Sequence, residues 1–175
     1  IGNEACIYMI AVKIQDIKDF MSKLLIGSAF DSFWLSEASV TTSVTYTVDG
    51  VLHEDFFDTE ENRKLQEEGR DYALWRDMKP FFFTIIKGKK TPLHFKIIFR
   101  LSRNNTQKLL QGSGLSYGIE EIFGLFLNFQ YDGASLTCTT GTSLKTFTLD
   151  KSLDHAWDEL VLKYFKQQQI LWESV

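Results

Sequence analysis

The sequence predicts an α+β domain in which a curved antiparallel sheet of about six to seven strands packs on one long C-terminal helix. Three observations support this prediction. Segments with alternating apolar residues recur along the chain, and turn sequences such as Asp49-Gly50 and Asp132-Gly133 separate them. Successive hairpins imply antiparallel pairing. A single apolar stripe with helical spacing then runs through 150–172.

The C-terminal helix is expected over Asp150–Trp172, with Asp150 or Ser152 as its N-cap. At about 1.5 Å per residue, such a helix would be roughly 30 Å long. A stripe this rich in aromatic residues needs a large apolar surface to cover, and the β-rich sequence before it supplies one. The stripe consists of Leu153, Ala156, Trp157, Leu160, Val161, Tyr164, Phe165, Leu171 and Trp172.

The N-terminal part of the chain begins with a short strand at Ile10–Ile14. A helix follows, capped by Asp16 and ended by Gly27. Alternating residues over Glu37–Val48 predict the clearest strand of the chain. Asp49-Gly50 is a type I′ hairpin sequence, so we expect Val51–Phe57 to return along that strand.

The middle and the end of the chain alternate in the same way. The charged segment Asp58–Gly69 predicts a solvated helix, and Tyr72–Lys79 a short helix that stops before Pro80. A second hairpin is expected around Gly88, and a helix capped by Ser102 follows it. The segment GSGLSYG (112–118) is expected to be a flexible connector, with a lid over the mouth of a cavity as the alternative. The remaining strands are expected at Phe81–Lys87, Thr91–Leu101, Ile122–Tyr131, Ser135–Thr140 and Lys145–Leu149.

Composition favours one globular domain. The chain has 175 residues, of which 44% are hydrophobic and 14% aromatic, and its net charge is −4. We expect residues 9–175 to form this domain and residues 1–8 to be a remnant or an upstream extension. Cys6 and Cys138 lack a second ligand at metal-binding spacing, so no metal and no cofactor is expected. Isolated cysteines fit the reducing cytoplasm. No apolar run reaches the ~20 residues of a membrane span.

The order of predicted elements resembles the helix-grip fold of the START and Bet v 1 families. In that arrangement a curved antiparallel sheet wraps a long C-terminal helix. The resemblance implies an apolar cavity between the sheet and the helix. Another two-layer α+β sandwich or a half-barrel remains the alternative.

Three segments also resemble a family of uncharacterised bacterial proteins of about this size. They are MIAVKIQDIKDFM (9–21), PFFFTIIKGKKTPLHFK (80–96) and LTCTTGTSLKTFTLDKSLDHAWD (136–158). This resemblance implies a cytoplasmic single domain and no particular activity.

The hairpin register gives the first candidate site. If Asp49-Gly50 is a two-residue loop, Tyr46 faces His53 and both share the inward face with Asp55. With Trp157 of the final helix beneath them, the candidate ligand-binding residues are Tyr46, His53, Asp55 and Trp157. A longer or bulged loop would instead turn His53 and Asp55 to solvent. Alternatively, Asp55 satisfies a core histidine.

The first hypothesis is therefore a non-enzymatic module that binds a small apolar or amphipathic molecule between sheet and helix. An enzyme using His53 and Asp55 is the weakest hypothesis. Two side chains without a third group do not define a reaction.

Charge gives the second candidate site. Residues 78–119 contain eight Lys and Arg and no Asp or Glu. A basic hairpin over 87–103 would bind an anionic partner, nucleic acid or acidic protein. The alternative is a solvated strand face partnered by the acidic segment 49–77. The candidate anion-binding residues are Lys87, Lys89, Lys90, His94, Lys96 and Arg100.

Overall fold

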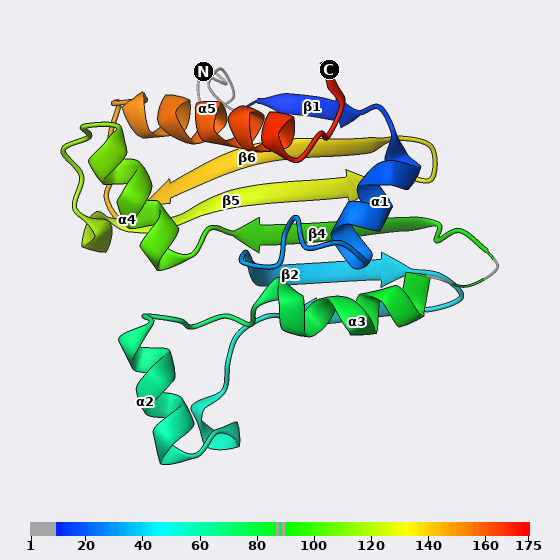
Figure 1. The fold of residues 1–175 in the computed structure, drawn as a ribbon, viewed down its shortest axis with the longest axis horizontal. Helices are drawn as coiled ribbons and strands as arrows, with labels where there is room; N and C mark the ends of the chain where they lie inside the picture. The colour runs from blue at the N-terminus through cyan, green and yellow to red at the C-terminus, as the bar shows by residue number, and fades with distance from the viewer. Residues whose placement is uncertain (1–9, 87, 89) are drawn as a thin grey trace.

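The computed structural model describes residues 10–86, 88 and 90–175, and in these residues seven strands form one antiparallel sheet (Figure 1). Their order is β3-β2-β4-β5-β6-β1-β7, and the sheet is open, not a closed barrel. This confirms the predicted α+β class with an antiparallel sheet and a C-terminal helix. The strands are β1 (Ala11–Ile14), β2 (Trp34–Thr41), β3 (Thr45–Asp49), β4 (His94–Arg100), β5 (Ile122–Tyr131), β6 (Leu136–Leu144) and β7 (Trp172–Ser174).

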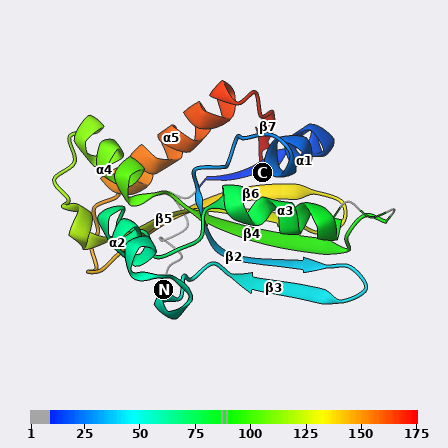
Figure 2. The same cartoon turned by 60° about the horizontal axis from the view of Figure 1, so that its bottom comes forward.

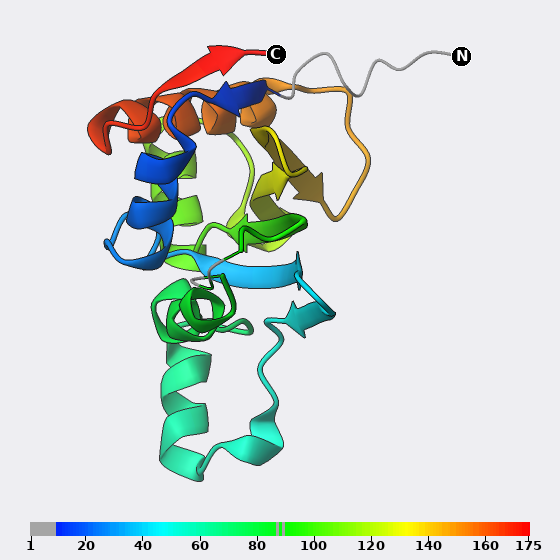
Figure 3. The same cartoon turned by 90° about the vertical axis from the view of Figure 1, so that its right-hand side faces the viewer.

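The helices α1, α3, α4 and α5 lie on one face of the curved sheet, as Figure 3 shows. Side chains that alternate along β4 and β5 point towards these helices and form the centre of the core. Phe99 of β4 stacks on Phe30 with ring centroids 5.5 Å apart, and Phe129 of β5 meets Phe20 at 4.8 Å. The helices are α1 (Ile17–Leu25), α2 (Thr59–Glu67), α3 (Trp75–Ile86), α4 (Arg103–Gly112) and α5 (Ser152–Gln167), with 3-10 turns η2 (Glu54–Phe56) and η3 (Ile119–Glu121).

The C-terminal helix α5 docks on the sheet through both apolar and polar contacts. Trp157, Val161 and Phe165 are buried, as their spacing predicts. On the side next to β6, the Thr140 hydroxyl donates to the Asp158 carboxylate at 2.5 Å, and Thr142 donates to Asp154. The two carboxylates are one turn apart, so they fix α5 along β6 as well as against the core.

The hairpin predicted at Asp49-Gly50 is wrong. The segment predicted as one strand is two, β2 and β3, and the chain turns between them at 42–44, where the Thr42 N–H donates to the Val44 carbonyl at 2.9 Å. Gly50 continues beside β2, with its N–H donating to Ser36 at 2.9 Å. The backbones approach so closely there that a Cβ on Gly50 would lie 1.7 Å from the Leu35 carbonyl oxygen. The glycine therefore marks a close approach, not a turn.

The hairpin predicted around Gly88 is also wrong, because α3 continues through Pro80 to Ile86. Trp75 and Phe82, two turns apart, are both buried, and the Trp75 indole donates to the Leu24 carbonyl at 2.9 Å. This packing holds the helix on both sides of Pro80, which is itself exposed. Strand β4 pairs with β2 and β5 instead.

The last third of the chain departs from prediction at three points. The N-cap of α5 is Lys151, which makes no side-chain cap hydrogen bond, and not Asp150 or Ser152. Strand β6 runs through Gly141 to Leu144, and 145–149 forms no strand. Helix α5 ends at Gln167, because Gln169 adopts a left-handed conformation (φ 57°) and the Ile170 N–H bonds back to the Phe165 carbonyl at 2.8 Å. Trp172 is therefore not helical but begins β7, which pairs with β1.

Helix α2 stands away from the sheet, at the lower left of Figure 1. None of its residues is buried. Asp58 and Glu61 form a capping box, and Arg63 pairs with Glu60 at 2.5 Å and Glu67 at 3.0 Å. We call residues 53–69, which include η2 and α2, the arm. Among the described residues, no helix is both long and apolar enough to cross a membrane.

Candidate functional site

A pocket of about 470 Å³ opens between α4, α5 and the inner face of the sheet. We call it the seam pocket. Its volume falls within the range of small-molecule sites, roughly 300–1,000 Å³. Its walls are mostly apolar. The lining residues are Ser32, Phe33, Leu101, Asn105, Lys108, Leu109, Gly112, Ser113, Leu127, Trp157, Leu160, Val161 and Tyr164.

Local sequence explains how the pocket forms. Ser102 caps α4 by accepting from the Asn105 N–H at 3.2 Å, so the chain turns sharply after β4. Helix α4 then buries Leu110 in the core and turns Leu109 towards the pocket. At its far end, a Cβ on Gly112 would meet no atom within 4 Å. The absence of a side chain at this position leaves the pocket open between α4 and α5.

Two aromatic side chains of α5 form a fixed wall. Trp157 is 1% exposed, and its indole N–H donates to the Phe126 carbonyl at 2.9 Å. The Tyr164 hydroxyl donates to the Ala29 carbonyl, and burial raises the pKa of Tyr164 above its usual value. Because backbone carbonyls already accept from both polar groups, the two rings offer the pocket mainly apolar surface.

The polar lining residues are few, and three of them come from α4 and its end: Asn105, Lys108 and Ser113. Lys108 is exposed and makes no ion pair with any described residue. An apolar wall with an ammonium group at one side is suited to an amphipathic molecule whose polar end is anionic or accepts hydrogen bonds.

Of the first predicted site, only Trp157 lines the seam pocket. Tyr46 lies on the edge strand β3 and is 41% exposed. His53 and Asp55 are exposed beside and within η2, on the arm. The three do not come together with Trp157, because the register that would have paired Tyr46 with His53 depends on a turn that does not form.

The second predicted set divides among several environments. Lys87 and Lys89 lie outside the described residues. Lys90 and His94 are exposed. Lys96 pairs with Glu37 at 3.4 Å. The Arg100 guanidinium lies among aromatic rings, 5.6 Å from Trp34, 5.3 Å from Tyr72 and 5.1 Å from Phe123.

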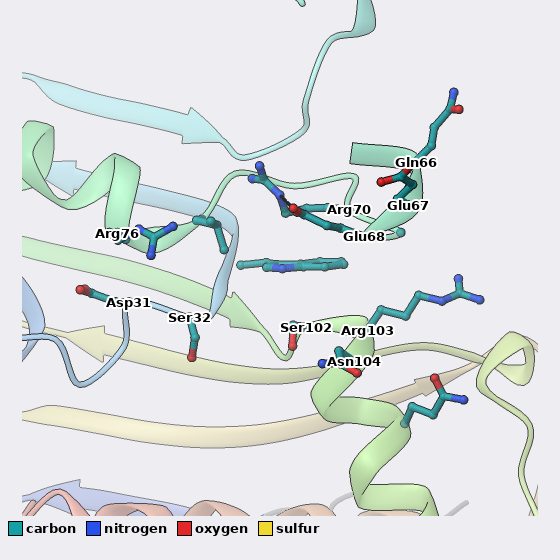
Figure 4. A pocket seen from close by; sticks show the side chains of 14 residues that line it. Asp31, Ser32, Gln66, Glu67, Glu68, Arg70, Arg76, Ser102, Arg103 and Asn104 are labelled. Atoms are coloured by element: carbon teal, nitrogen blue, oxygen red, sulfur yellow. Dashed lines mark hydrogen bonds and ion pairs between the residues drawn. The ribbon is translucent and has the colours of Figure 1, made fainter. Parts of the chain in front are cut away.

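A larger cleft, of about 750 Å³, separates the arm from the body of the domain (Figure 4). Arg70 and Glu68 project from one wall, and Ser102, Arg103 and Asn104, at the start of α4, form the other. Most charges here pair locally: Arg70 with Glu68 at 3.2 Å, and Asp31 with Lys79 at 2.6 Å. Arg103 crosses to the arm, where a Cβ on Gly69 would lie 2.6 Å from its Cδ. The cleft is thus a mixed-charge contact between arm and body.

Cys138 is not placed as a reactive thiol. Cys138 is fully buried in β6, and desolvation raises the pKa of its thiol well above the usual value. Cys6 lies outside the described residues. No cluster of three or more potential metal ligands occurs among the residues described.

The sequence missed most of the seam pocket. The apolar spacing of α5 pointed to Trp157, but Leu109 and Lys108 of α4 were assigned no role. A signal for this face of α4 was present in the sequence, because Leu109 and Leu110 are the apolar residues near the end of a short, otherwise polar helix. Nothing in the sequence indicates that α4 and α5 leave a space between them.

Comparisons with known proteins identify the family. No curated protein and no solved structure matches the chain. The model of a family described as one of unknown function, DUF5721, matches residues 23–173, which include β2 to β6 and α5. This match agrees with the resemblance to an uncharacterised family, and the chain belongs to the DUF5721 family.

Proposed function

We propose that this protein binds a small amphipathic molecule in the seam pocket, as a binding module and not as an enzyme. The observation that supports this proposal is the mostly apolar pocket of about 470 Å³ between the sheet and α5, walled by Trp157. The apolar part of the ligand would lie against Trp157, Leu127 and Leu160. Burial contributes about 25 cal/mol per Å² of apolar surface removed from water.

The polar end of the ligand would lie at Lys108, with Asn105 and Ser113 as further hydrogen-bonding groups. The side chains that line the pocket support a proposal of binding without catalysis. None of the three histidines is among them, and no described lining residue pairs a nucleophile with a general base.

A suitable probe is 1-anilinonaphthalene-8-sulfonate, which joins an apolar ring system to an anionic group. We expect saturable binding to the folded protein, measured by the rise in dye fluorescence. Gly112→Trp places an indole in the open end of the pocket and should abolish binding. The matched control is Gln111→Trp, on the neighbouring exposed residue that does not line the pocket, and it should bind normally.

Lys108→Glu tests the polar end. Losing a charged hydrogen bond costs about 1.5–3 kcal/mol, so the dye should bind roughly tenfold or more weakly. Lys163→Glu, on the exposed side of α5, makes the same charge change away from the pocket. Native mass spectrometry of the protein purified from cells then looks for a retained small molecule. Equal dye binding by Gly112→Trp and Gln111→Trp would refute the seam pocket as the site. Retention on heparin that Lys90→Glu abolishes would instead favour an anionic partner at 87–103.

A further inference from the structure

The edge strand β3 offers an unpaired row of backbone groups. Figure 2 shows β3 at one edge of the sheet, and no described strand lies beyond it. The even-numbered residues of β3 and its flanks direct their backbone groups towards β2. At one end the Gly50 N–H donates to the Ser36 carbonyl, and at the other the Thr42 N–H donates to the Val44 carbonyl, each at 2.9 Å. Between these two bonds the register pairs Ala38 with Val48. In an antiparallel ladder, backbone groups alternate between the two sides. Those of Thr45, Thr47 and Asp49 therefore point outward.

This edge lacks the usual protection against pairing. Natural edge strands carry lysine, proline or a bulge that discourages a second strand. Strand β3 reads Thr-Tyr-Thr-Val-Asp and pairs regularly with β2 over its whole length. Apolar side chains beside the edge are also exposed, Val44 by 55% and Tyr46 by 41%. No described backbone group outside β2 bonds to the backbone of Thr45, Thr47 or Asp49. The Asp49 carboxylate accepts from the Val51 N–H at 3.1 Å, which leaves the backbone groups of Asp49 itself unpaired on this side.

We propose that two copies of this chain associate through β3, antiparallel and centred on Thr47, so that their sheets become one continuous sheet. In this register Thr47 pairs with Thr47, and Thr45 pairs with Asp49, across the twofold axis. All the outward groups of the three residues are then satisfied, by about six hydrogen bonds. Tyr46 comes opposite Val48, an aromatic and β-branched pair that stabilises sheets.

Other registers are less favourable. Centring the pair on Tyr46 or Val48 leaves one outward residue of each copy unpaired. Centring it on Asp49 places two carboxylates directly opposite each other, which destabilises a strand pair. The sequence of β3 is thus self-complementary in one arrangement. This is why we infer a second copy and not an unrelated extended peptide.

The charges beyond the strand support the same arrangement. The arm, with seven acidic and two basic residues, begins four residues after the Asp49 end of β3, and Figure 2 shows α2 beyond that end of the strand. The turn at 42–44 lies at the opposite end of β3, beside the start of β4, where the register pairs Thr41 with the exposed His94. The exposed Lys90 comes four residues before His94 in the chain. Antiparallel pairing brings the acidic arm of each copy to the basic end of the other. High salt should therefore weaken the dimer.

Sedimentation velocity and light scattering of the full chain test the proposal, and we expect twice the 20.2 kDa mass of one chain. Thr47→Pro removes only an outward N–H, so β2 and β3 remain paired while the dimer is lost. Thr47→Ala keeps that N–H and should remain dimeric. Lys90→Glu should weaken the dimer by at most about fivefold, whereas Lys163→Glu should not. Circular dichroism checks that each variant is folded.

A crosslink tests the register without relying on a disruptive variant. The Cα atoms of a hydrogen-bonded antiparallel pair lie about 5.5 Å apart, within the range a disulfide spans. With Cys6 replaced by serine, Thr47→Cys should form a covalent dimer under mild oxidation. Thr45→Cys should not, because Thr45 faces Asp49 of the other copy. A monomer mass at every concentration would overturn the proposal, as would a dimer that Thr47→Pro leaves intact or a crosslink through Thr45→Cys.

Discussion

Replacing Trp157 with phenylalanine tests whether α5 is held on the sheet as described. The indole is 1% exposed, and its N–H donates to the Phe126 carbonyl at 2.9 Å. Phenylalanine cannot make this hydrogen bond, which contributes about 0.5–1.5 kcal/mol. Removing a whole aromatic side chain from a core costs about 3–5 kcal/mol, but the phenylalanine ring still fills most of the space and so retains much of this packing energy. We expect the free energy of unfolding to fall by about 2–3 kcal/mol in total.

The assay is urea unfolding followed by circular dichroism, with thermal unfolding alongside. For a chain of this size, 1 kcal/mol shifts the melting temperature by about 2–4 °C, so we expect a fall of about 4–12 °C. Trp172→Phe is the matched control. Trp172 is half-buried on β7, and its indole makes no hydrogen bond with a described residue. The Trp172→Phe substitution should therefore lower the free energy of unfolding by less than about 1 kcal/mol. Equal effects of the two substitutions would refute the anchoring role of Trp157.

Three further variants test individual features of the fold. Gly50→Ala would place a Cβ 1.7 Å from the Leu35 carbonyl oxygen. We therefore expect the free energy of unfolding, measured in urea, to fall by about 3 kcal/mol or more, and a near-neutral result would contradict the close approach. Pro80→Ala restores an N–H inside α3 and should stabilise the protein by about 1–3 kcal/mol in thermal unfolding, whereas destabilisation would mean that the proline supports the helix. Desolvation raises the pKa of Asp158 above 3.8, so its ionisation destabilises the fold as pH rises through the folded pKa. Asp158→Asn should remove this decline in unfolding free energy, which begins as pH rises above the usual aspartate pKa of about 4, and parallel pH profiles of the two proteins would disprove it.

Local chemistry made three of the helix starts predictable. Asp16, Asp58 and Ser102 each accept a hydrogen bond from a backbone N–H three residues later, as their positions before polar or amphipathic segments indicated. The buried face of α5 and the alternating faces of β4 and β5 were predictable for the same reason, since periodicity reports which side meets the core. The overall fold class followed from these elements.

Tertiary packing decided the features that the sequence did not reveal. Gly50 serves a close approach to Leu35, a contact between segments that no local pattern encodes. Burial of Trp75 and Phe82 outweighs the cost of Pro80 within α3. The prediction that Tyr46, His53 and Asp55 lie together depended on a turn at Asp49-Gly50. Because the chain turns at 42–44 instead, the three side chains do not form a common site. The seam pocket arises where two helices fail to meet, and this depends on the positions of both.

The first strand of the sheet has consequences for how the protein is made. Strand β1 lies between β6 and β7, although more than a hundred residues separate it from either in the chain. During synthesis, β1 has no neighbour in the sheet until β6 and β7 have been made, so these pairings are among the last of the sheet to form. A fragment trimmed to the family match at residue 23 would lack β1, leaving β6 with an open edge and β7 with nothing to pair with. Expression of this domain therefore requires its N-terminal strand.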